Sequence, residues 1–585
     1  MGLPFNLNRF GGGRKKRKYY CEVESLTSDG NQYIDIGIGV KDNTVFKAIF
    51  SVASSGNGYS YFGARNSSNE RFQIVNSIGI GAGYYIESSV YPIANQKYEI
   101  EMHANGDMYL DGVKRNASTG TFSQVSFERN LWLFATNYYN SSVGPGASTF
   151  WKAQVFEGDA LVRDLIPVLD WNMTPCMFDR VTEQLFYNAG SGNGFSYGRE
   201  IHYVDYLETT GTQYIDCGLT GNQDTSTSIT FQNTQVEKQG IVIGSRSSAS
   251  SNNISTISPA ASGGSNYNVV NDFGNYNTTR QIVALQAMTD KVTAYNSKSL
   301  RTVYNHETGV TNTVTTTYTG TFTTPTNIYI AFKSSGYASS QYNFIGEIYD
   351  CKIWDNGTLV RDYIPAIDET GKAYMFDRVS HTIYDNAGTG AFSYPAREVE
   401  YLESTGTQYI DTGFTPNQNT KTELDYKITT DLSSGFPLFG SRTSASSKGY
   451  SYQRYGSGVM GGQYGSNIAY STTSPDANRH IVIRDKNKIY LDGTEIVTQA
   501  TATFTCPGNL YLNAMNNNGT AAIQNAGVAY YGMKIYDNNT LVRDFIPCYK
   551  NGALGMWDKE NNVFYLNAGT GDGFITGKIV EPEYE

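Results

Sequence analysis

Short runs of apolar residues alternate with polar ones along most of this chain, and turn-forming pairs separate the runs. Lys352–Asp355, for example, is followed by Asn356-Gly357 and then by Leu359–Arg361. Asn-Gly between two such runs is the strongest short signal for a β-hairpin, because both turn residues need a positive φ. A long apolar pattern with helical spacing is missing. The pattern therefore predicts an all-β protein built from many short antiparallel strands.

A second kind of hairpin occurs in two parts of the chain. His480–Arg484 and Ile489–Gly493 form two apolar runs around a polar turn. Tyr98–His103 and Met108–Gly112 repeat this arrangement nearer the N-terminus. Both second runs end in Asp-Gly, which is itself a turn signal. Many short strands joined by tight turns indicate a sandwich or barrel of β-sheets.

Three sequence blocks occur three times each. The first contains Gln-Tyr-Ile-Asp, the second reads Leu-Val-Arg-Asp and ends in Ile-Pro, and the third is Asn-Ala-Gly. The first block lies at 31–37, 205–218 and 400–413, the second at 161–167, 359–365 and 541–547, and the third at 188–190, 386–388 and 567–569. Solenoid repeats run about 20–50 residues, far less than this spacing, which is the length of a domain. The sequence therefore predicts three homologous domains.

The run from Arg479 to Gly493 resembles the signature of laminin-G-like, concanavalin A-like jelly rolls, in which a strand beginning with His turns into Tyr-x-Asp-Gly. The flanking blocks Gln408–Gly413, Leu541–Pro547 and Asn567–Gly569 resemble laminin-G-like modules in virion proteins of phages of gut bacteria. The resemblance covers residues 20–577. It implies an all-β fold of three tandem jelly-roll sandwiches after a short basic N-terminal arm.

The repeats set the expected domain boundaries. We expect an anchor arm at 1–18 and jelly-roll domains at 19–199, 200–397 and 398–585. The linkers have about six residues, which reach only about 20 Å when extended. The C-terminal segment Gly577–Glu581 resembles the domain openings Gly198–Ile201 and Ala396–Val399. We therefore expect each of these segments to pack as part of the preceding domain.

The first eighteen residues differ from the rest in charge, because they are basic and lack acids while the whole chain carries −10. Their few apolar residues precede the basic cluster, which is not the order of a signal peptide, and no apolar run of about 18 residues predicts a transmembrane helix. We expect this arm to bind other virion proteins; contact with nucleic acid and a solvated tail are the alternatives. The proposed anchor residues are Leu3, Phe5, Phe10, Arg14, Lys15, Lys16, Arg17 and Lys18.

Four sets of polar residues recur at equivalent positions. They are Asp35, Asp216 and Asp411; Arg65, Arg246 and Arg442; Arg163, Arg361 and Arg543; and Asp179, Asp377 and Asp558. Strand alternation places Arg543 on the face of Leu541 and Phe545. A buried arginine needs a partner, and Asp558 is the candidate. We interpret these sets as structural ion pairs and turn residues, with a repeated ligand site as the alternative.

Motifs for catalysis and metal binding are weak or missing. Glu398–Glu403 fits only loosely the Glu-x-Asp-x-x-Glu of concanavalin A-like glycosidases, and Gly-x-Ser-x-Gly and His-Glu-x-x-His do not occur. We therefore predict no enzyme activity and no catalytic residues. Calcium at Asp111 or Asp492 is an alternative to the expectation of no cofactor and no metal. The cysteines are scattered singly, so we expect free thiols and no disulfide framework.

Three segments rich in Tyr, Ser, Gly and Asn differ most between the repeats: Ser54–Tyr61, Ser247–Tyr276 and Gly449–Tyr464. We expect them to be loops that carry binding specificity, with plain solvated loops as the alternative.

The resemblance implies a phage virion protein, such as a fibre, a spike or a capsid decoration. We expect it to assemble in the host cytoplasm, to form a homo-oligomer, and to adhere non-covalently to host-surface or mucosal glycans through weak sites that gain avidity. No membrane or nucleic-acid partner is expected. A purely structural spacer or decoration is the first alternative, and a polysaccharide depolymerase is the second.

Overall fold

The computed structural model describes residues 16–53, 59–66, 71–75, 79–82, 93–115, 126–139, 141–143, 146–235, 240–245, 252–258, 267–274, 281–285, 289–315, 317–331, 343–430, 435–456, 458–472, 474–522, 526–571 and 573–582. Every regular element among these residues is a β-strand, which confirms the all-β prediction. Within the same residues, no helix is long and apolar enough to cross a membrane.

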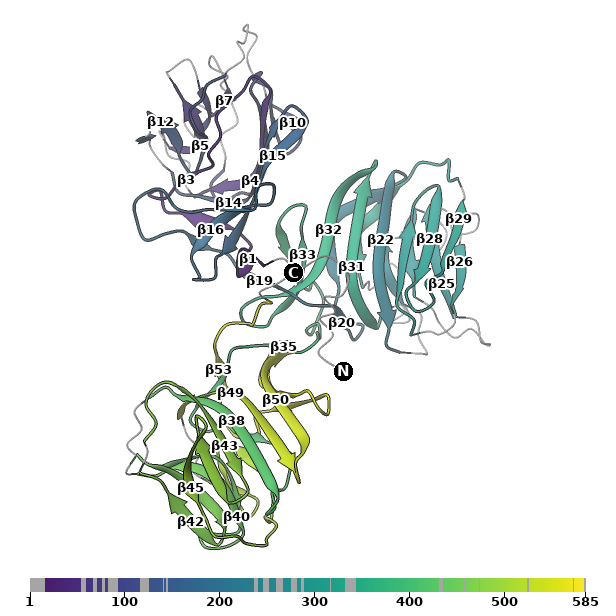
Figure 1. Cartoon of the computed structure of the whole chain (residues 1–585). Helices are drawn as coiled ribbons and strands as arrows, with labels where there is room; N and C mark the ends of the chain where they lie inside the picture. Colours follow the sequence, from purple (N-terminus) through teal and green to yellow (C-terminus); the bar gives the residue numbers. More distant parts are fainter. Residues whose placement is uncertain are drawn as a thin grey trace. The chain divides into compact units, whose positions relative to one another are not determined.

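The chain divides into two compact units (Figure 1). Unit 1 holds Ser393–Val580 with Thr370–Lys372. Unit 2 holds the described residues up to Glu369, together with Ala373–Phe392 and the C-terminal residues from Glu581. Unit 1 therefore contains the third sequence repeat, and unit 2 contains the first two.

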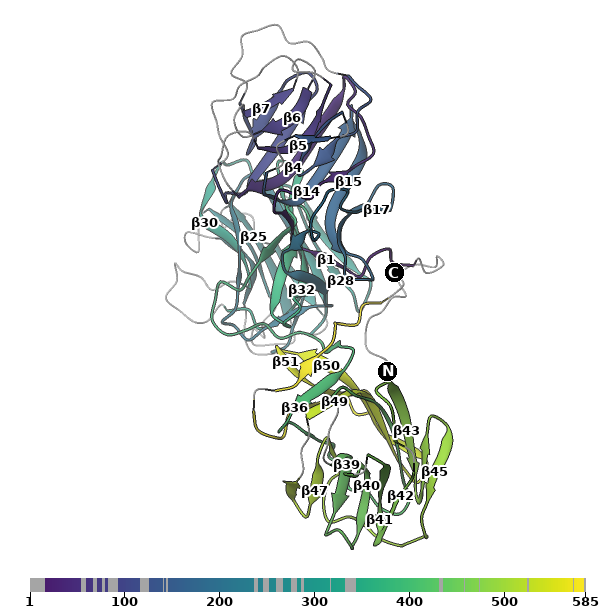
Figure 2. The ribbon, with the colours of Figure 1, turned by 90° about the vertical axis from the view of Figure 1, so that its left-hand side faces the viewer.

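Two sheets build unit 1 (Figure 2). The larger sheet contains β35 (Arg397–Glu398), β36 (Leu402–Thr405), β38 (Thr420–Ile428), β43 (Arg479–Asp485), β44 (Lys488–Leu491), β45 (Thr494–Thr498), β49 (Ala526–Asp537), β50 (Thr540–Lys550), β51 (Ala553–Asp558), β52 (Val563–Leu566) and β53 (Ile575–Thr576). The smaller sheet contains β37 (Ile410–Asp411), β39 (Phe436–Arg442), β40 (Gly449–Arg454), β41 (Met460–Gly465), β42 (Asn467–Tyr470), β46 (Tyr511–Leu512), β47 (Met515–Asn517) and β48 (Thr520–Ala522).

Buried tyrosines join the two sheets of unit 1. Tyr426 on β38 and Tyr452 on β40 share a hydrogen bond of 3.1 Å between their hydroxyls, and both side chains are fully buried. Tyr450 donates its hydroxyl to the carbonyl of Arg484, at 3.0 Å. Tyrosine suits this position because its ring fills the core while its hydroxyl keeps a partner. The unit is therefore a two-sheet sandwich with a partly polar core.

One large sheet runs through both repeats of unit 2. From the first repeat it takes β1 (Cys21–Val23), β2 (Leu26–Ser28), β4 (Thr44–Val52), β8 (Tyr98–His103), β9 (Met108–Leu110), β10 (Val113–Lys114), β14 (Ser148–Glu157), β15 (Ala160–Leu169), β16 (Pro175–Asp179), β17 (Gln184–Phe186) and β18 (Ser196–Tyr197). From the second repeat it takes β19 (Glu200–Tyr203), β20 (Leu207–Thr209), β22 (Thr225–Asn233), β27 (Val292–Asn296), β28 (Leu300–Asn305), β29 (Thr311–Thr315), β31 (Gly346–Asp355), β32 (Thr358–Ile367), β33 (Ala373–Asp377) and β34 (Thr382–Tyr384).

Each repeat of unit 2 also has a smaller sheet of its own. That of the first repeat contains β3 (Ile34–Asp35), β5 (Ser60–Arg65), β6 (Arg71–Val75), β7 (Gly79–Ala82), β11 (Trp132–Leu133), β12 (Thr136–Tyr138) and β13 (Ser141–Val143). That of the second repeat contains β21 (Ile215–Asn222), β23 (Ile241–Ser245), β24 (Asn253–Ile257), β25 (Tyr267–Gly274), β26 (Gln281–Leu285) and β30 (Thr323–Ile330).

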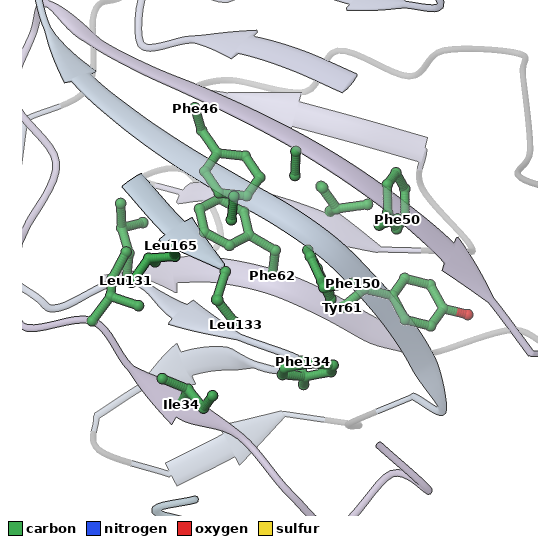
Figure 3. Close-up of a cluster of buried hydrophobic side chains, with 14 of the residues drawn as sticks. Ile34, Phe46, Phe50, Tyr61, Phe62, Leu131, Leu133, Phe134, Phe150 and Leu165 are labelled. Carbon is green, nitrogen blue, oxygen red and sulfur yellow. The ribbon is translucent and has the colours of Figure 1, made fainter. Parts of the chain in front are cut away.

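The core of the first repeat lies between its large and small sheets (Figure 3). Phe46 on β4 stacks on Phe62 on β5, with ring centroids 3.5 Å apart. Alternation along β4 sends Phe46, Ala48 and Phe50 inward, where they are buried. In the second repeat, the amide of Asn296 on β27 donates to the carbonyl of Asp272 on β25, at 2.9 Å. Both repeats therefore place a small sheet on a face of the large one.

β19 is the strand at which the two repeats of unit 2 meet. It pairs with β1 of the first repeat and with β32 of the second. The segment 198–201 therefore packs partly against the preceding repeat. Because one strand serves both repeats, a single sheet continues across the junction.

The predicted hairpins are confirmed. β31 and β32 meet at Asn356-Gly357, whose φ angles are 47° and 80°, as the turn requires. β8 and β9 form the hairpin expected at 98–110, and β43 and β44 form the one expected at 480–491. All six cysteines are free, as predicted, and all six are buried.

The expectation of variable loops is wrong for two of the three segments. Gly449–Tyr464 forms β40 and most of β41, whose residues are largely buried. The described part of Ser247–Tyr276 forms β24 and β25. In β40 and β41, Gly461 and Gly462 lie close to neighbouring backbones, while Tyr450, Tyr452 and Tyr464 fill the core. In Ser54–Tyr61, residues 54–58 lie outside the described residues.

Candidate binding site

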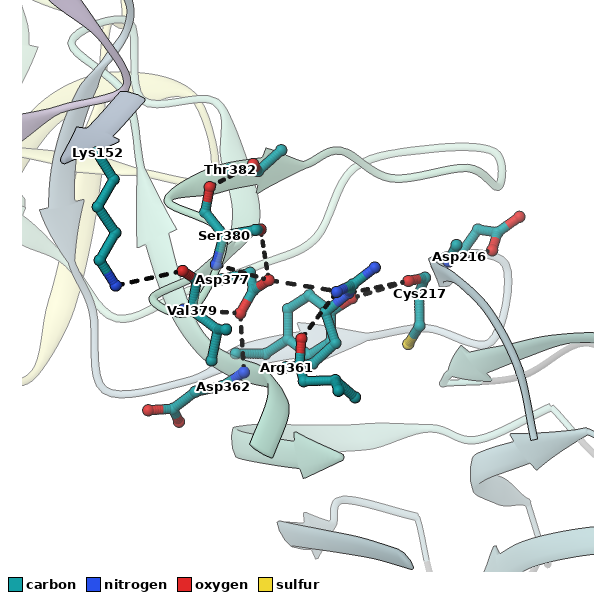
Figure 4. Close-up of polar contacts among 12 residues, drawn as sticks. Lys152, Asp216, Cys217, Arg361, Asp362, Asp377, Val379, Ser380 and Thr382 are labelled. Carbon is teal, nitrogen blue, oxygen red and sulfur yellow. Dashed lines mark hydrogen bonds and ion pairs between the residues drawn. The ribbon is translucent and has the colours of Figure 1, made fainter. Parts of the chain in front are cut away.

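The repeated arginines and aspartates lie together in all three repeats. Arg163, Arg361 and Arg543 place Nε 3.6, 3.8 and 3.5 Å from a carboxylate oxygen of Asp179, Asp377 and Asp558, respectively. The three aspartates are completely buried. Around Asp377, the amide of Asp362 donates to the carboxylate at 2.8 Å and that of Val379 at 3.1 Å (Figure 4). Each aspartate is enclosed and accepts hydrogen bonds from its own repeat, which favours the structural interpretation over a ligand site.

The same residues join the three sequence blocks to one another. Arg163, Arg361 and Arg543 donate Nε to the carbonyls of Ile36, Cys217 and Thr412, each the second-to-last residue of the first block. The acceptor is a backbone carbonyl, so this hydrogen bond does not depend on the side chain, which is Ile36, Cys217 or Thr412 in the three repeats. The asparagines of the third block, Asn188, Asn386 and Asn567, accept from the amides of Tyr33, Tyr214 and Tyr409 in the first block. The three blocks are therefore parts of one recurring contact.

The other two repeated sets separate in the structure. Asp35, Asp216 and Asp411 accept hydrogen bonds from the amides of Gly37, Gly218 and Gly413 in tight turns. Arg65 lies over the ring of Tyr138, at 4.2 Å from its centroid. Arg442 ends β39, and Arg246 lies outside the described residues. The structure does not gather these sets into one site.

One of the proposed anchor residues, Arg17, is buried in the folded structure. Leu3, Phe5, Phe10, Arg14 and Lys15 lie outside the described residues. Lys16 and Lys18 are exposed, but Arg17 is buried and donates to Glu581 at 2.6 Å. The indole of Trp171 also donates to the backbone carbonyl of Arg17, at 3.1 Å. Arg17 is therefore part of the folded structure and not of a free arm.

The Asp-Gly turns have a structural explanation. Asp492 accepts from the amide of Ile481 at 2.9 Å and lies 2.7 Å from Nδ1 of His480. Asp111 accepts from the amide of Glu99 at the equivalent place. These carboxylates connect the second strand of the hairpin to the first, which explains why His and Asp-Gly occur together in the signature. Calcium at either aspartate would compete with these bonds.

A groove of about 300 Å³ lies on the outer face of the larger sheet of unit 1. It is lined by Glu423, Leu424, Asp425, Ile481, Gly532, Met533, Lys534, Asp544, Phe545, Ile546 and Lys559. Leu424 and Met533 point into the core, so strand alternation turns Glu423, Asp425 and Lys534 outward. The groove is therefore part of the exposed face of the sandwich.

Two rows of side chains cross the sheet in this groove. One row places Ile481 beside Asp425 and Asp425 beside Gly532. The other row places Glu423 beside Lys534 and Lys534 beside Asp544. Gly532 has no side chain to fill its place in the first row, and Ile481 is half-exposed at the other end. The groove thus combines an apolar surface at Ile481 with carboxylate acceptors and the ammonium donor of Lys534.

An arginine and a tyrosine flank the groove. Arg479 donates to both carboxylate oxygens of Asp425, at 2.7 and 2.6 Å, and lies 3.9 Å from the ring centroid of Tyr531. The hydrogen bonds to Asp425 raise the pKa of Arg479, so the guanidinium stays charged. Tyr401 lies 5.6 Å from Tyr531, measured between ring centroids. The planes of the two rings are tilted by 58° to one another. The guanidinium and the two rings thus add aromatic and cationic groups next to Asp425.

Every carboxylate in the groove is paired with a cation. Asp425 pairs with Arg479, Asp544 with Lys559 at 3.2 Å, and Glu423 with Lys421 at 2.6 Å. Lys534, which is exposed, adds a further donor among them. A balanced set of donors and acceptors suits a neutral ligand with many hydroxyls better than a highly charged one. The sequence alone does not predict this site, because its residues come from five separate segments. Asp544 recurs as Asp164 and Asp362, but Asp425 and Gly532 have no counterparts in the repeated blocks.

No protein-family model and no curated protein matches the sequence. Among solved structures, domains LG4-5 of the mouse laminin alpha1 chain are 11% identical, with a TM-score of 0.27, over 65% of this chain and 98% of that one. The LG1-3 region of the laminin alpha2 chain is also 11% identical, with a TM-score of 0.25, over 88% and 96%.

A sialidase is a further structural neighbour. NanB sialidase from Streptococcus pneumoniae is 9% identical, with a TM-score of 0.18, over 93% of this chain and 99% of that one. All three scores lie well below 0.5, so these likenesses carry no inference about activity. The chain is an all-β protein of two-sheet sandwiches, as its own sheets show.

Proposed function

We propose that this protein is a phage virion protein, a fibre, spike or capsid decoration, that adheres non-covalently to host-surface or mucosal glycans. The observation that carries the binding part is the groove of unit 1, which combines paired carboxylates, the exposed Lys534 and an apolar contact at Ile481. Sugar hydroxyls donate to carboxylates and accept from lysine, while sugar C–H groups pack on apolar or aromatic surfaces. We further propose that the three repeats form three tandem jelly rolls, as their shared sequence blocks imply.

The virion context is supported by the resemblance of the repeated blocks and by the basic N-terminal segment. In this proposal the segment before Arg17 attaches the protein to the particle. Copies on one particle then present many weak glycan sites, whose combined avidity exceeds each affinity. A homo-oligomer in the virion adds to this effect.

The groove is tested by reversing the charge of Lys534. We expect Lys534→Glu to weaken binding of neutral glycans about tenfold to hundredfold, because it removes a charge-assisted donor and places a third acid in that row. Binding is measured by titration calorimetry with ligands first selected on an array of bacterial-surface and mucin glycans. Lys488→Glu is the matched control, since Lys488 lies on the same sheet, pairs with the exposed Glu495 and does not line the groove.

Three results would redirect this proposal. Equal binding by Lys534→Glu and Lys488→Glu places the glycan site elsewhere. Absence of binding to every glycan on the array favours the spacer or decoration role. Release of reducing ends from a bound polysaccharide makes the protein a depolymerase, with the carboxylates of the groove as the first candidates for catalysis.

The N-terminal segment is tested by deleting residues 1–15. This deletion keeps Arg17 and its bond to Glu581, so we expect thermal unfolding to match that of the full chain. Co-purification with assembled particles of the source should be lost. Deleting residues 1–18 instead removes a buried ion pair and should lower the unfolding temperature of unit 2. Particle association that survives the 1–15 deletion would show that the sandwiches themselves bind the particle.

A further inference from the structure

β1 and β19 lie side by side (Figure 1). Their pairing brings Cys21 and His202 together. The register places Glu22 opposite Ile201 and Val23 opposite Glu200. The next pair in this antiparallel register is Cys21 and His202. Directly opposed residues share a face of the sheet, so Cys21, Glu200 and His202 all lie on one face. Glu22 lies on the other face.

The three side chains present ligand atoms of types that bind zinc. The Cys21 sulfur, a Glu200 carboxylate oxygen and a His202 ring nitrogen all lie within 4.8 Å of one another. Cys21 and His202 are completely buried, and the Glu200 side chain keeps 11% exposure. Ligand atoms around a tetrahedral zinc lie roughly 3–4 Å apart, so small side-chain adjustments bring the three into place.

A second set of contacts orients His202. Its Nε2 lies 2.9 Å from Glu200, the candidate ligand, while its Nδ1 lies 2.8 Å from Glu581. Glu581 in turn accepts from Arg17 at 2.6 Å. A histidine that binds a metal usually donates its other nitrogen to a carboxylate, which fixes the ring. Here Glu581, which is held by Arg17, fixes the orientation of the His202 ring without a bound metal.

We propose that Cys21, Glu200 and His202 form a zinc-binding site at the junction of the first two repeats, with Glu581 as the residue that positions His202. The sulfur and nitrogen ligands favour zinc over calcium or magnesium, which prefer oxygen ligands alone. Three protein ligands leave the fourth tetrahedral position to water.

Zinc binding displaces protons from its ligands, because zinc binds a thiolate and a deprotonated ring nitrogen. Binding forms Zn–S, Zn–N and Zn–O bonds and releases the thiol proton of Cys21, together with any proton on Nε2 of His202, to solvent. The thiolate of Cys21 and the carboxylate of Glu200 together supply two negative charges, which offset the two positive charges of the zinc ion.

The test is performed on the full chain after treatment with a chelator and dialysis. We expect titration with Zn²⁺ to reach one ion per chain, measured by plasma mass spectrometry after gel filtration, and to raise the unfolding temperature of unit 2. Titration with Co²⁺ should give the near-ultraviolet charge-transfer band of a cobalt–thiolate bond. This spectrum needs no variant, so it tests the proposal even where substitutions impair folding.

Variants then assign the ligands. Cys21→Ser should abolish the charge-transfer band, His202→Gln should prevent stoichiometric binding, and Glu581→Gln should weaken zinc affinity about tenfold to hundredfold while keeping the band. Cys176→Ser is the matched control, because Cys176 is another buried, free cysteine of unit 2. The proposal is overturned if the chain binds no zinc at stoichiometric concentration, if the cobalt complex lacks the thiolate band, or if Cys21→Ser binds as the full chain does.

Discussion

Replacing Asp558 by alanine should destabilise unit 1 by about 3–5 kcal/mol, among the largest single-residue effects expected in this protein. Asp558 is completely buried and accepts from the amides of Asp544 and Glu560 and from the side chain of Asn561. Alanine leaves two backbone donors without an acceptor. It also leaves the Arg543 guanidinium, whose side chain is 17% exposed, without its neighbouring carboxylate.

Asp558→Ala removes only part of the interactions of Arg543. Arg543 still donates to the carbonyls of Thr412, Val542 and Gly413, so its hydrogen bonds survive while its charge is left uncompensated. Asp558→Asn keeps one acceptor oxygen and should cost less than alanine. Arg543→Met combined with Asp558→Asn should cost less than the sum of the two single changes, because contacting residues couple by about 0.5–3 kcal/mol.

The measurement is denaturant unfolding, with hydrogen exchange of peptides from β50 and β51 to assign the change to unit 1. Glu560→Gln is the control, since its exposed side chain lies two residues from Asp558 and should leave unfolding unchanged. If Asp558→Ala unfolds like this control, the buried pair contributes nothing to stability. The repeated residues would then need a functional explanation in place of a structural one.

Local signals in the sequence predict much of this fold. Asn356-Gly357 and the runs on either side specify a hairpin through backbone conformation alone, so a short window suffices. The conserved spacing of three blocks within each copy indicates a shared architecture. The spacing of the blocks does not show how they contact one another. In the structure, Arg543 of the second block donates a hydrogen bond to a backbone carbonyl of the first block. Because every residue type has a backbone carbonyl, this hydrogen bond does not restrict which residue supplies it, and the sequence cannot show it.

Other features depend on pairing between distant strands. Tyr450 and Tyr464 look like parts of an adaptable loop, because Tyr, Ser and Gly are frequent there, yet burial between two sheets makes both part of the core. Cys21 and His202 belong to different repeats and meet only through β19. The groove likewise arises where Gly532 lies opposite Asp425, a register that no single segment encodes.

Gly63→Ala should destabilise unit 2 by about 3 kcal/mol or more, for two independent reasons. The φ of Gly63 is +128°, a backbone conformation that costs an alanine about 1–3 kcal/mol. A methyl group there would also lie 2.1 Å from the carbonyl oxygen of Phe72 on the paired strand β6. Overpacking against a neighbouring backbone costs a further 1–3 kcal/mol or so, because the strand cannot move without losing its own hydrogen bonds.

Two further glycines separate these causes. Gly112 has a φ of +73° and nothing within 4 Å of a new methyl group, so Gly112→Ala should cost only about 1–2 kcal/mol. Gly440, the equivalent of Gly63 in the third repeat, would place a methyl 2.5 Å from the sulfur of Met515. A flexible methionine moves more easily than a carbonyl, so Gly440→Ala should cost less than Gly63→Ala. Calorimetric unfolding of the three variants gives the order, and a cost for Gly63→Ala no greater than that for Gly112→Ala would show that β5 and β6 do not approach this closely.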